Sequence, residues 1–284
     1  MSPLRVVVLG ARGFLGSAVV RAGRKNPYVG DVRAVCRPGS SPNGVVADVR
    51  DPEQVAAVVA GADVVVNAAH VIGTGAATEV NRIGPAVVAR AAAIAGAKCI
   101  ELGTAAVYGR GPLRGGAEGR VAVAPGSDLS VSRAAGEQEA MRAGATVLRP
   151  MIVVGPGDRW AVPGAAAAAA SLSRVPRASV GVVDVDDLAR LTLSVAVMDD
   201  VPPLLHVSRR EPVPLARLLD DAGYRPPPDT EAHGQVAAML DTDRWVDSRH
   251  VWQVVGWEPE GPVISEAARR WYGTPPAGAA RTMV

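Results

Sequence analysis

The fold is decided by the stretch Leu4-Arg-Val-Val-Val-Leu-Gly10-Ala-Arg-Gly13-Phe-Leu-Gly16, residues 4–16. Its apolar run has the length of a buried strand, and the apolar-periodic segment from Ser17 to Ala22 indicates a helix. The three glycines between them predict a tight turn that a pyrophosphate can approach closely. The first N–H groups of the helix and the positive end of its dipole would face the phosphates. The alternative is an ordinary strand-to-helix turn, and the rest of the chain has to decide between the two.

Composition narrows the class of protein. Hydrophobic residues make up 48% of the 284 residues and the formal net charge is +2, which disfavours disorder and a nucleic-acid surface. Two cysteines cannot build a disulfide framework, and four scattered histidines lack metal-ligand spacing, so no metal is expected. The chain begins in a strand and contains no apolar run long enough to cross a bilayer. We therefore expect a cytoplasmic protein with a small-molecule substrate and no nucleic-acid or membrane partner.

The second expected strand bears on the choice of cofactor. It covers residues 32–36 and ends in Arg37-Pro-Gly-Ser40-Ser41, where the adenosine ribose would be recognised. An acidic residue there would bind the ribose 2′-hydroxyl, whereas Arg37, together with Arg12 in the glycine loop, suits a 2′-phosphate. NADP is therefore favoured over NAD. The alternative is that Arg37 only lines a solvated rim.

Strands and helices alternate through the next hundred residues. Short apolar strands are expected at residues 44–48, 62–67 and 99–103, separated by helices that begin near Asp51 and Thr78. This spacing predicts an α/β fold with a Rossmann-type, doubly wound parallel sheet. The carboxyl ends of such strands carry the ligands, which directs attention to Asn67-Ala68-Ala69-His70 and to Thr104.

The order of these motifs resembles a known family. Gly10-x-x-Gly13-x-x-Gly16, Asp48, Asn67-Ala-Ala, Asn81 and Thr104-Ala-Ala-Val-Tyr108-Gly are similar to the extended short-chain dehydrogenase/reductases, which include NAD(P)-dependent nucleotide-sugar epimerases, dehydratases and ketoreductases. The resemblance continues through Leu148-Arg-Pro and Asp184-Val-Asp-Asp187 to Trp271-Tyr. It implies cofactor contacts from Gly10, Arg12, Gly13, Phe14, Leu15, Gly16, Arg37, Asp48, Val49, Ala68, Ala69 and Arg133.

The same resemblance implies how the chain is divided. A dinucleotide-binding Rossmann domain would cover residues 1–155, with residues 183–200 packing back onto it. Residues 156–182 and 201–273 would form a small C-terminal substrate lobe, and residues 274–284 a flexible tail. The stretch 158–180 is short and alanine-rich, and only Arg159, Arg174 and Arg177 offer groups for a diphosphate, which argues against a nucleotide-diphosphate substrate.

The expected catalytic residues are incomplete. The family uses a Ser or Thr hydroxyl, a tyrosine and, four residues later, a lysine; the tyrosine serves as acid or base beside the nicotinamide. Thr104 matches the hydroxyl position, although a threonine bonded to backbone is the alternative. In the register set by Ser132-Arg133-x-x-x-Glu137, Leu129 replaces the tyrosine and Arg133 the lysine. Asp128, His70, the substrate or water would then supply the proton, unless His70 is only a polar group of its loop.

Three functions follow from these residues. The first is an NADP-dependent oxidoreductase of ketoreductase or epimerase type, acting on a carbonyl-bearing small molecule such as a deoxysugar or a secondary-metabolite intermediate. The second, suggested by the missing tyrosine, is an NADP-binding sensor or partner subunit without redox turnover. The third is a non-redox cyclase or isomerase that keeps the cofactor fold. A homodimer through the helices near 78–95 and 132–143 would accord with the family.

Overall fold

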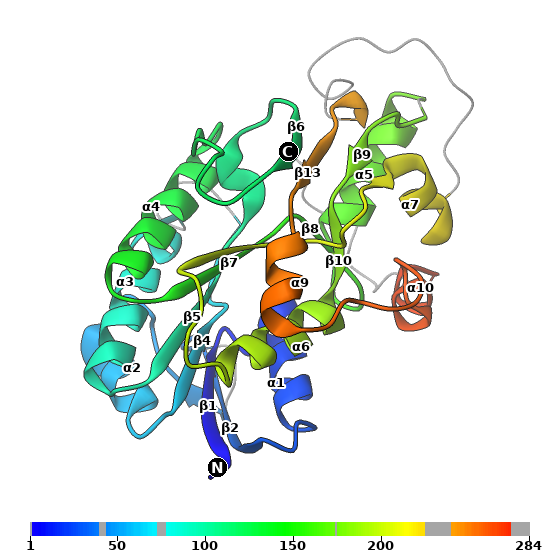
Figure 1. Cartoon of the computed structure of the whole chain (residues 1–284). Coiled ribbons are helices and arrows are strands. Elements are labelled where there is room, and N and C mark those ends of the chain that lie inside the picture. Colours follow the sequence, from blue (N-terminus) through cyan, green and yellow to red (C-terminus); the bar gives the residue numbers. More distant parts are fainter. Residues whose placement is uncertain (1, 40–43, 73–77, 174, 225–239, 274–284) are drawn as a thin grey trace.

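The computed structural model describes residues 2–39, 44–72, 78–173, 175–224 and 240–273, and its centre is a seven-stranded sheet (Figure 1). All neighbouring strands in this sheet are parallel. The α/β, doubly wound prediction is confirmed. The strand order is β11 (Leu204–Val207), β7 (Thr146–Pro150), β5 (Lys98–Leu102), β4 (Val64–Asn67), β1 (Leu4–Leu9), β2 (Val29–Cys36) and β3 (Val45–Val46).

Helices cover both faces of the sheet because alternate side chains of each strand point to opposite sides. In β1, Val6 and Val8 belong to one apolar cluster, and Val7 and Leu9 to the other. The first cluster includes side chains of α1 (Phe14–Gly23), α6 (Val185–Ala196) and α9 (Arg249–Val255). The second includes side chains of α2 (Pro52–Val59), α3 (Thr78–Ile94) and α4 (Asp128–Arg142).

Local sequence signals set where two of these helices begin. The Asp51 carboxylate accepts from the N–H groups of Glu53 and Gln54, and Pro52 occupies the first helical position of α2. Helix α4 begins with a capping box in which Ser127 and Ser130 exchange hydrogen bonds. Helix α4 therefore begins at Asp128, four residues before the start that the sequence suggests.

A smaller lobe stands beside the carboxyl ends of the strands (Figure 1). Its apolar cluster joins α5 (Ala161–Ser171), α7 (Leu215–Asp221) and α10 (Glu266–Gly273). Its strands form a pair, β8 (Ile152–Val154) with β10 (Val182–Asp184), and a four-stranded sheet in the order β12 (Val213–Pro214), β9 (Ser179–Val180), β13 (Arg244–Val246) and β6 (Leu113–Gly116).

The last helix is tied to a segment far earlier in the chain. The Tyr272 hydroxyl donates to Asp158 Oδ2 at 2.9 Å and accepts from the Gly155 N–H at 3.0 Å. The indole N–H of Trp271 donates to the Asp158 carbonyl at 2.9 Å. Asp158 itself is buried, and its carboxylate also accepts from the first N–H groups of α5. Helix α10 therefore completes the lobe by satisfying a buried carboxylate.

Two parts of the predicted division are wrong. Strand β11 and helix α9 lie within 201–273, yet β11 pairs with β7 at the edge of the main sheet and α9 packs on that sheet. In the opposite direction, β6 lies within 1–155 but pairs with β13 of the small lobe. Helix α6, inside 183–200, packs on the main sheet beside α1. The tail 274–284 lies outside the described residues.

Within the part of the chain that the structure describes, no helix has the length and apolar character needed to cross a membrane. The same residues contain no group of histidine, cysteine and acidic side chains that could hold a metal ion.

Candidate functional site

A cavity of about 700 Å³ crosses the carboxyl ends of four strands of the main sheet. In the sheet, β2 and β3 lie on one side of β1, and β4 and β5 lie on its other side. This is the switch point at which open parallel sheets bind their ligands. The walls come from β3 and its loop (Ala47, Asp48, Val49, Arg50), β2 and its loop (Val35, Cys36, Arg37, Pro38), the glycine loop (Leu9, Gly10, Arg12, Gly13), the residues after β4 (Ala68, Ala69, His70, Val71) and Val80.

Each of the three glycines of the loop is needed for a different physical reason. Gly10 has a φ of +76°, and a Cβ there would lie 2.5 Å from the Ala68 carbonyl oxygen. A Cβ on Gly16 would lie 2.3 Å from the Gly10 carbonyl oxygen, so this glycine lets the helix approach the strand. Gly13 caps α1 without a side-chain hydrogen bond, and it lines the cavity. Because Gly13 has no side chain, the N-terminus of α1 adjoins the cavity through the backbone of its cap, which suits phosphate binding.

Arginines dominate one end of the cavity. Arg12 and Arg37 are exposed at its rim. Asp48 lies nearby but is engaged by Arg50, whose Nε donates to Asp48 Oδ1 at 3.0 Å; this contact lowers the pKa of the Asp48 carboxyl. Ser40 and Ser41, predicted to lie beside Arg37, are outside the described residues. Two exposed guanidinium groups, of Arg12 and Arg37, therefore lie at this end of the cavity.

His70 stands at the other end, and a buried carboxyl group lies behind it. Its Nε2 is 2.6 Å from Glu101 Oε1, and only 12% of the His70 side chain is exposed. Glu101 is fully buried, and its Oε2 accepts from the Asn67 amide at 2.6 Å. Burial raises the pKa of Glu101 to about 8, partly offset by the charge of Arg133 and the Asn67 bond, and burial lowers the pKa of His70 well below its ordinary value.

Burial penalises charge on both partners, which favours a neutral pair, with a protonated Glu101 beside an uncharged His70, over an ion pair. Oε2 already accepts from the Asn67 amide, so the hydroxyl is Oε1, which donates to His70 Nε2. The histidine therefore carries its own proton on Nδ1. Within the described residues, Nδ1 makes no hydrogen bond to protein.

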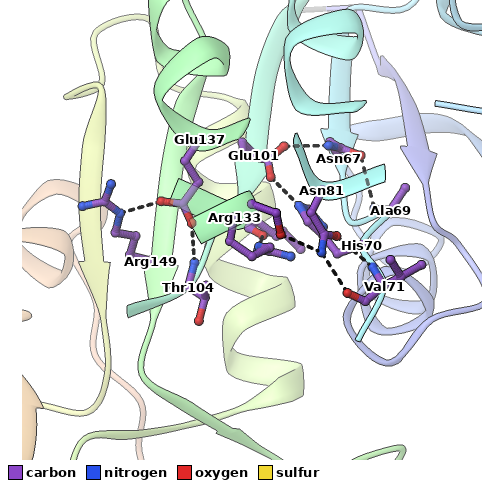
Figure 2. A network of polar contacts seen from close by, with 12 residues as sticks. Asn67, Ala69, His70, Val71, Asn81, Glu101, Thr104, Arg133, Glu137 and Arg149 are labelled. Carbon is purple, nitrogen blue, oxygen red and sulfur yellow. Dashed lines mark hydrogen bonds and ion pairs between the residues drawn. The ribbon is translucent and has the colours of Figure 1, made fainter. Parts of the chain in front are cut away.

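Helix α4 supplies the charges on the far side of Glu101 (Figure 2). Arg133 donates from Nη2 to the Leu102 carbonyl at 2.7 Å, and its Nε is buried without a partner. Burial lowers the pKa of Arg133, against the attraction of Glu101 and Glu137. Glu137 accepts from the Thr104 N–H at 2.8 Å and from Arg149 Nε at 2.7 Å. Two buried side chains of α4 thereby hold the end of β5: Arg133 bonds to the Leu102 carbonyl, and Glu137 bonds to the Thr104 N–H.

The same network fixes Tyr108. Its hydroxyl accepts from Arg149 Nη1 at 2.7 Å and so donates to His206 Nε2, 2.5 Å away. The phenol is buried and does not line the cavity. Thr104 Oγ1 accepts from the Ala106 N–H at 3.2 Å, which starts the short 3₁₀ helix Ala105–Tyr108 and leaves the hydroxyl proton of Thr104 for another acceptor.

Comparison with known proteins identifies the family of the chain. The family model described as "NAD dependent epimerase/dehydratase family" matches residues 6–202. The chain belongs to this family. Among solved structures, the Bordetella bronchiseptica enzyme WbmH in complex with NAD⁺ is similar at 22% identity, covers 92% of this chain and 95% of its own, and has a TM-score of 0.73. UDP-glucuronic acid 4-epimerase from Bacillus cereus, in complex with NAD, is 16% identical over 95% and 99% of the two chains, with a TM-score of 0.73. No match is found among the curated proteins.

The residues that line the cavity include most, but not all, of the predicted site residues. Nine of the predicted residues line the cavity: Gly10, Arg12, Gly13, Arg37, Asp48, Val49, Ala68, Ala69 and His70. Six do not: Phe14, Leu15, Gly16, Thr104, Asp128 and Arg133.

Each of the main exceptions has a physical reason. The Phe14 ring packs against Gly157 of the small lobe. Arg133 turns toward the carbonyl of Leu102 and two buried carboxyl groups. Asp128 is exposed at the first turn of α4.

Sequence reasoning missed two groups that organise this family's site here. Glu101 stands in an otherwise apolar strand, Cys-Ile-Glu-Leu, and an acidic residue in such a run was the available signal. Asn67 was noticed only as part of a family motif, whereas its amide orients Glu101 and its Oδ1 accepts from the Ala69 N–H at 3.2 Å.

Proposed function

We propose that the protein is an NADP-dependent oxidoreductase of ketoreductase or epimerase type. Its substrate would be a carbonyl-bearing small molecule such as a deoxysugar or a secondary-metabolite intermediate. The observation that carries the proposal is the cavity across the switch point, with arginines at one end, the glycine loop in the middle and His70 at the other end. A bound nicotinamide would supply or accept the hydride.

The residues of the chain divide the work around the cavity. The Gly13 N–H already donates to the Gly10 carbonyl at 2.9 Å, so the first N–H groups of α1, from Phe14 on, would receive the pyrophosphate. Arg12 with Arg37 would bind the 2′-phosphate. The Thr104 hydroxyl, whose backbone N–H is anchored on Glu137, would polarise the substrate oxygen. Leu129 has no proton to give, so the proton must come from another group.

Cofactor choice is tested by titration. NADP⁺ and NAD⁺ are titrated into the wild type, Arg37→Ala and Arg12→Ala, with Arg24→Ala as a control that removes an exposed charge elsewhere on the surface. We expect NADP⁺ to bind more tightly than NAD⁺, and each cavity variant to lose about tenfold or more for NADP⁺, since a charge-assisted contact contributes roughly 1.5–3 kcal/mol. Tighter binding of NAD⁺ by the wild type would overturn the choice of NADP.

A second candidate is an NADP-binding protein without redox turnover. Two observations favour it: Leu129 stands at the tyrosine position, and Arg133, at the lysine position, is directed into the protein rather than into the cavity. Turnover of NADPH over a panel of carbonyl compounds, by the wild type and by Leu129→Tyr, separates the two. A silent wild type beside an active variant would favour the binding protein.

The oligomeric state can be tested independently. We propose a homodimer through the outer faces of α3 and α4, where Ile94 is 90% exposed and Val131 is 51% exposed. Light scattering should give twice the chain mass of 29.1 kDa, and Val131→Lys should shift the equilibrium to the monomer. A wild type that stays monomeric at micromolar concentration would refute this.

A further inference from the structure

His70 occupies a fixed position at the end of the cavity where the reactive part of a dinucleotide would lie. With the adenosine over the β2 end, the other half of the molecule extends past β1 toward β4. Hydrogen bonds from two asparagines hold the backbone on both sides of His70. Asn67 holds the Ala69 N–H, and Asn81 exchanges two hydrogen bonds of 2.9 Å with the backbone of Val71. The imidazole is therefore preorganised rather than free to swing in its loop (Figure 2).

Glu101 is placed to act only through His70. It is fully buried and does not line the cavity, so it cannot touch a ligand there. One of its oxygens is used by Asn67 and the other by His70. An acidic residue buried in the centre of a parallel sheet, with a histidine as its ion-pair contact, costs folding free energy. Its placement behind a cavity histidine calls for a functional explanation.

The surroundings allow Glu101 to lose its proton when required. From α4, Arg133 faces the carboxyl with a positive charge, while Glu137 contributes a negative charge that is itself bonded to Arg149 of β7. From β5, Cys99 is the other titratable neighbour, and burial raises its pKa so that it stays neutral. From β4 the Asn67 amide contacts Glu101, and it does not titrate. The amide of Asn81 in α3 does not titrate either, and it bonds to Val71 and Ser132. A carboxylate at Glu101 would thus be stabilised by Arg133 and Asn67.

We propose that His70 is the catalytic acid–base of this site and that Glu101 is the residue that positions it and stores its proton. This assignment rests on the proposed redox function. It gives the chain a source for the proton that Leu129 cannot provide.

The proton step balances within the pair. A substrate carbonyl that receives hydride takes a proton from His70 Nδ1, so an N–H bond breaks and an O–H bond forms. At the same time the Oε1–H bond of Glu101 breaks and a bond from that hydrogen to Nε2 forms. The imidazole stays neutral, and the negative charge brought by the hydride ends on the Glu101 carboxylate beside Asn67 and Arg133. Oxidation of an alcohol follows the same path in reverse.

The first test needs no substrate. The wild type, Glu101→Gln and His70→Gln, the last for assignment, are labelled with ¹⁵N-histidine and followed by long-range ¹H–¹⁵N spectra from pH 6 to 9.5. We expect His70 to be the neutral Nδ1–H tautomer at pH 7 and to change to Nε2–H near pH 8 in the wild type. Glu101→Gln, whose side-chain amide donates to Nε2 at every pH, should keep Nδ1–H throughout. An Nε2–H tautomer at pH 7, or the same change in both proteins, would overturn the proposal.

The second test separates this proposal from the function on which it depends. NADPH is titrated into the wild type, Glu101→Gln and His250→Gln; the control histidine faces Glu118 outside the cavity, with Nδ1 3.8 Å from Oε2. Absence of NADPH binding by the wild type would refute the proposed function, while the tautomer change would still report on the pair. If NADPH binds, the His70 Nδ1 signal should shift in the wild type. A His70 signal that does not shift when NADPH binds would refute the role of His70 as the acid–base.

Turnover on a carbonyl from the panel supplies the last measurement. His70→Gln should lower kcat by about 10²–10⁴-fold, the usual contribution of a general acid–base. Glu101→Gln should lower kcat at least tenfold and remove the alkaline limb of its pH profile, with KM for NADPH unchanged. His250→Gln should match the wild type. A Glu101→Gln variant that keeps the wild-type pH profile would show that Glu101 is only structural.

Discussion

Replacing Glu101 by glutamine should change how the stability of the protein depends on pH. Burial raises the pKa of Glu101 to about 8 in the folded chain, against an ordinary value of 4.5. The folded state therefore holds a proton that the unfolded state has released at neutral pH. The stabilisation from this proton is complete below pH 4.5 and is lost as the pH rises through about 8.

The size of the effect follows from the two pKa values. Between pH 7 and pH 9, the wild type should lose about 1.4 kcal/mol of unfolding free energy relative to Glu101→Gln. Glutamine is a close control because its oxygen can accept from Asn67 and its NH₂ can donate to His70 Nε2, as the protonated acid does. All other titrating groups are common to both proteins and cancel in the difference.

Urea unfolding at pH 7, 8 and 9, followed by circular dichroism, measures this difference directly. We expect the two stability curves to converge or cross as the pH rises, with equal m-values. A difference that stays constant within about 0.3 kcal/mol would show that Glu101 is already ionised at pH 7. That result would refute the protonation state on which the role of His70 depends.

Four other substitutions test the packing. Gly16→Ala should prevent stable folding or lower the free energy of unfolding by more than about 3 kcal/mol, because its Cβ would lie 2.3 Å from a backbone carbonyl oxygen. Gly13→Ala, whose Cβ would have its nearest atom at 3.2 Å, should fold and mainly weaken cofactor binding. Equal changes in melting temperature for the two variants would contradict this. Arg149→Leu should cost roughly 3–5 kcal/mol in urea unfolding, since it leaves Glu137 buried beside one partner fewer; a loss below 1 kcal/mol would be inconsistent with the buried pair. Tyr272→Phe should cost about 1–2 kcal/mol by the same assay, and an unchanged midpoint would show that its hydroxyl bonds do not stabilise the lobe.

The fold was largely accessible from the sequence because its signals are local. The glycine loop, the apolar runs of strand length and the Asp51-Pro52 cap each depend on neighbours within a few residues. The position of β11 was missed for the opposite reason. Four residues at Leu204–Val207 join the sheet through pairing with β7, and no local pattern distinguishes that partner from the small lobe.

The site divides in the same way. Backbone features, such as the cradle around Gly10 and the residues after β4, were predicted because the strand ends set their place. Side-chain directions were not. The register predicted Arg133 at the position of the family lysine, but its guanidinium is directed inward, toward the Leu102 carbonyl and two buried carboxyl groups. Glu101 escaped notice because its meaning depends on Asn67 and His70, which come from another strand.

The bond between Tyr272 and Asp158 has a consequence for the order in which the chain matures. The two residues are 114 positions apart, so on the ribosome Asp158 is made long before the hydroxyl that satisfies it. Strands β1 to β5 and β7, six of the seven strands of the main sheet, are all complete by Pro150. Because domains fold from the N-terminal side during synthesis, these six strands can pair before α6, β11 and α9 complete the main sheet, while the lobe waits for α10. A nascent chain would then be able to hold a dinucleotide before it can enclose a substrate.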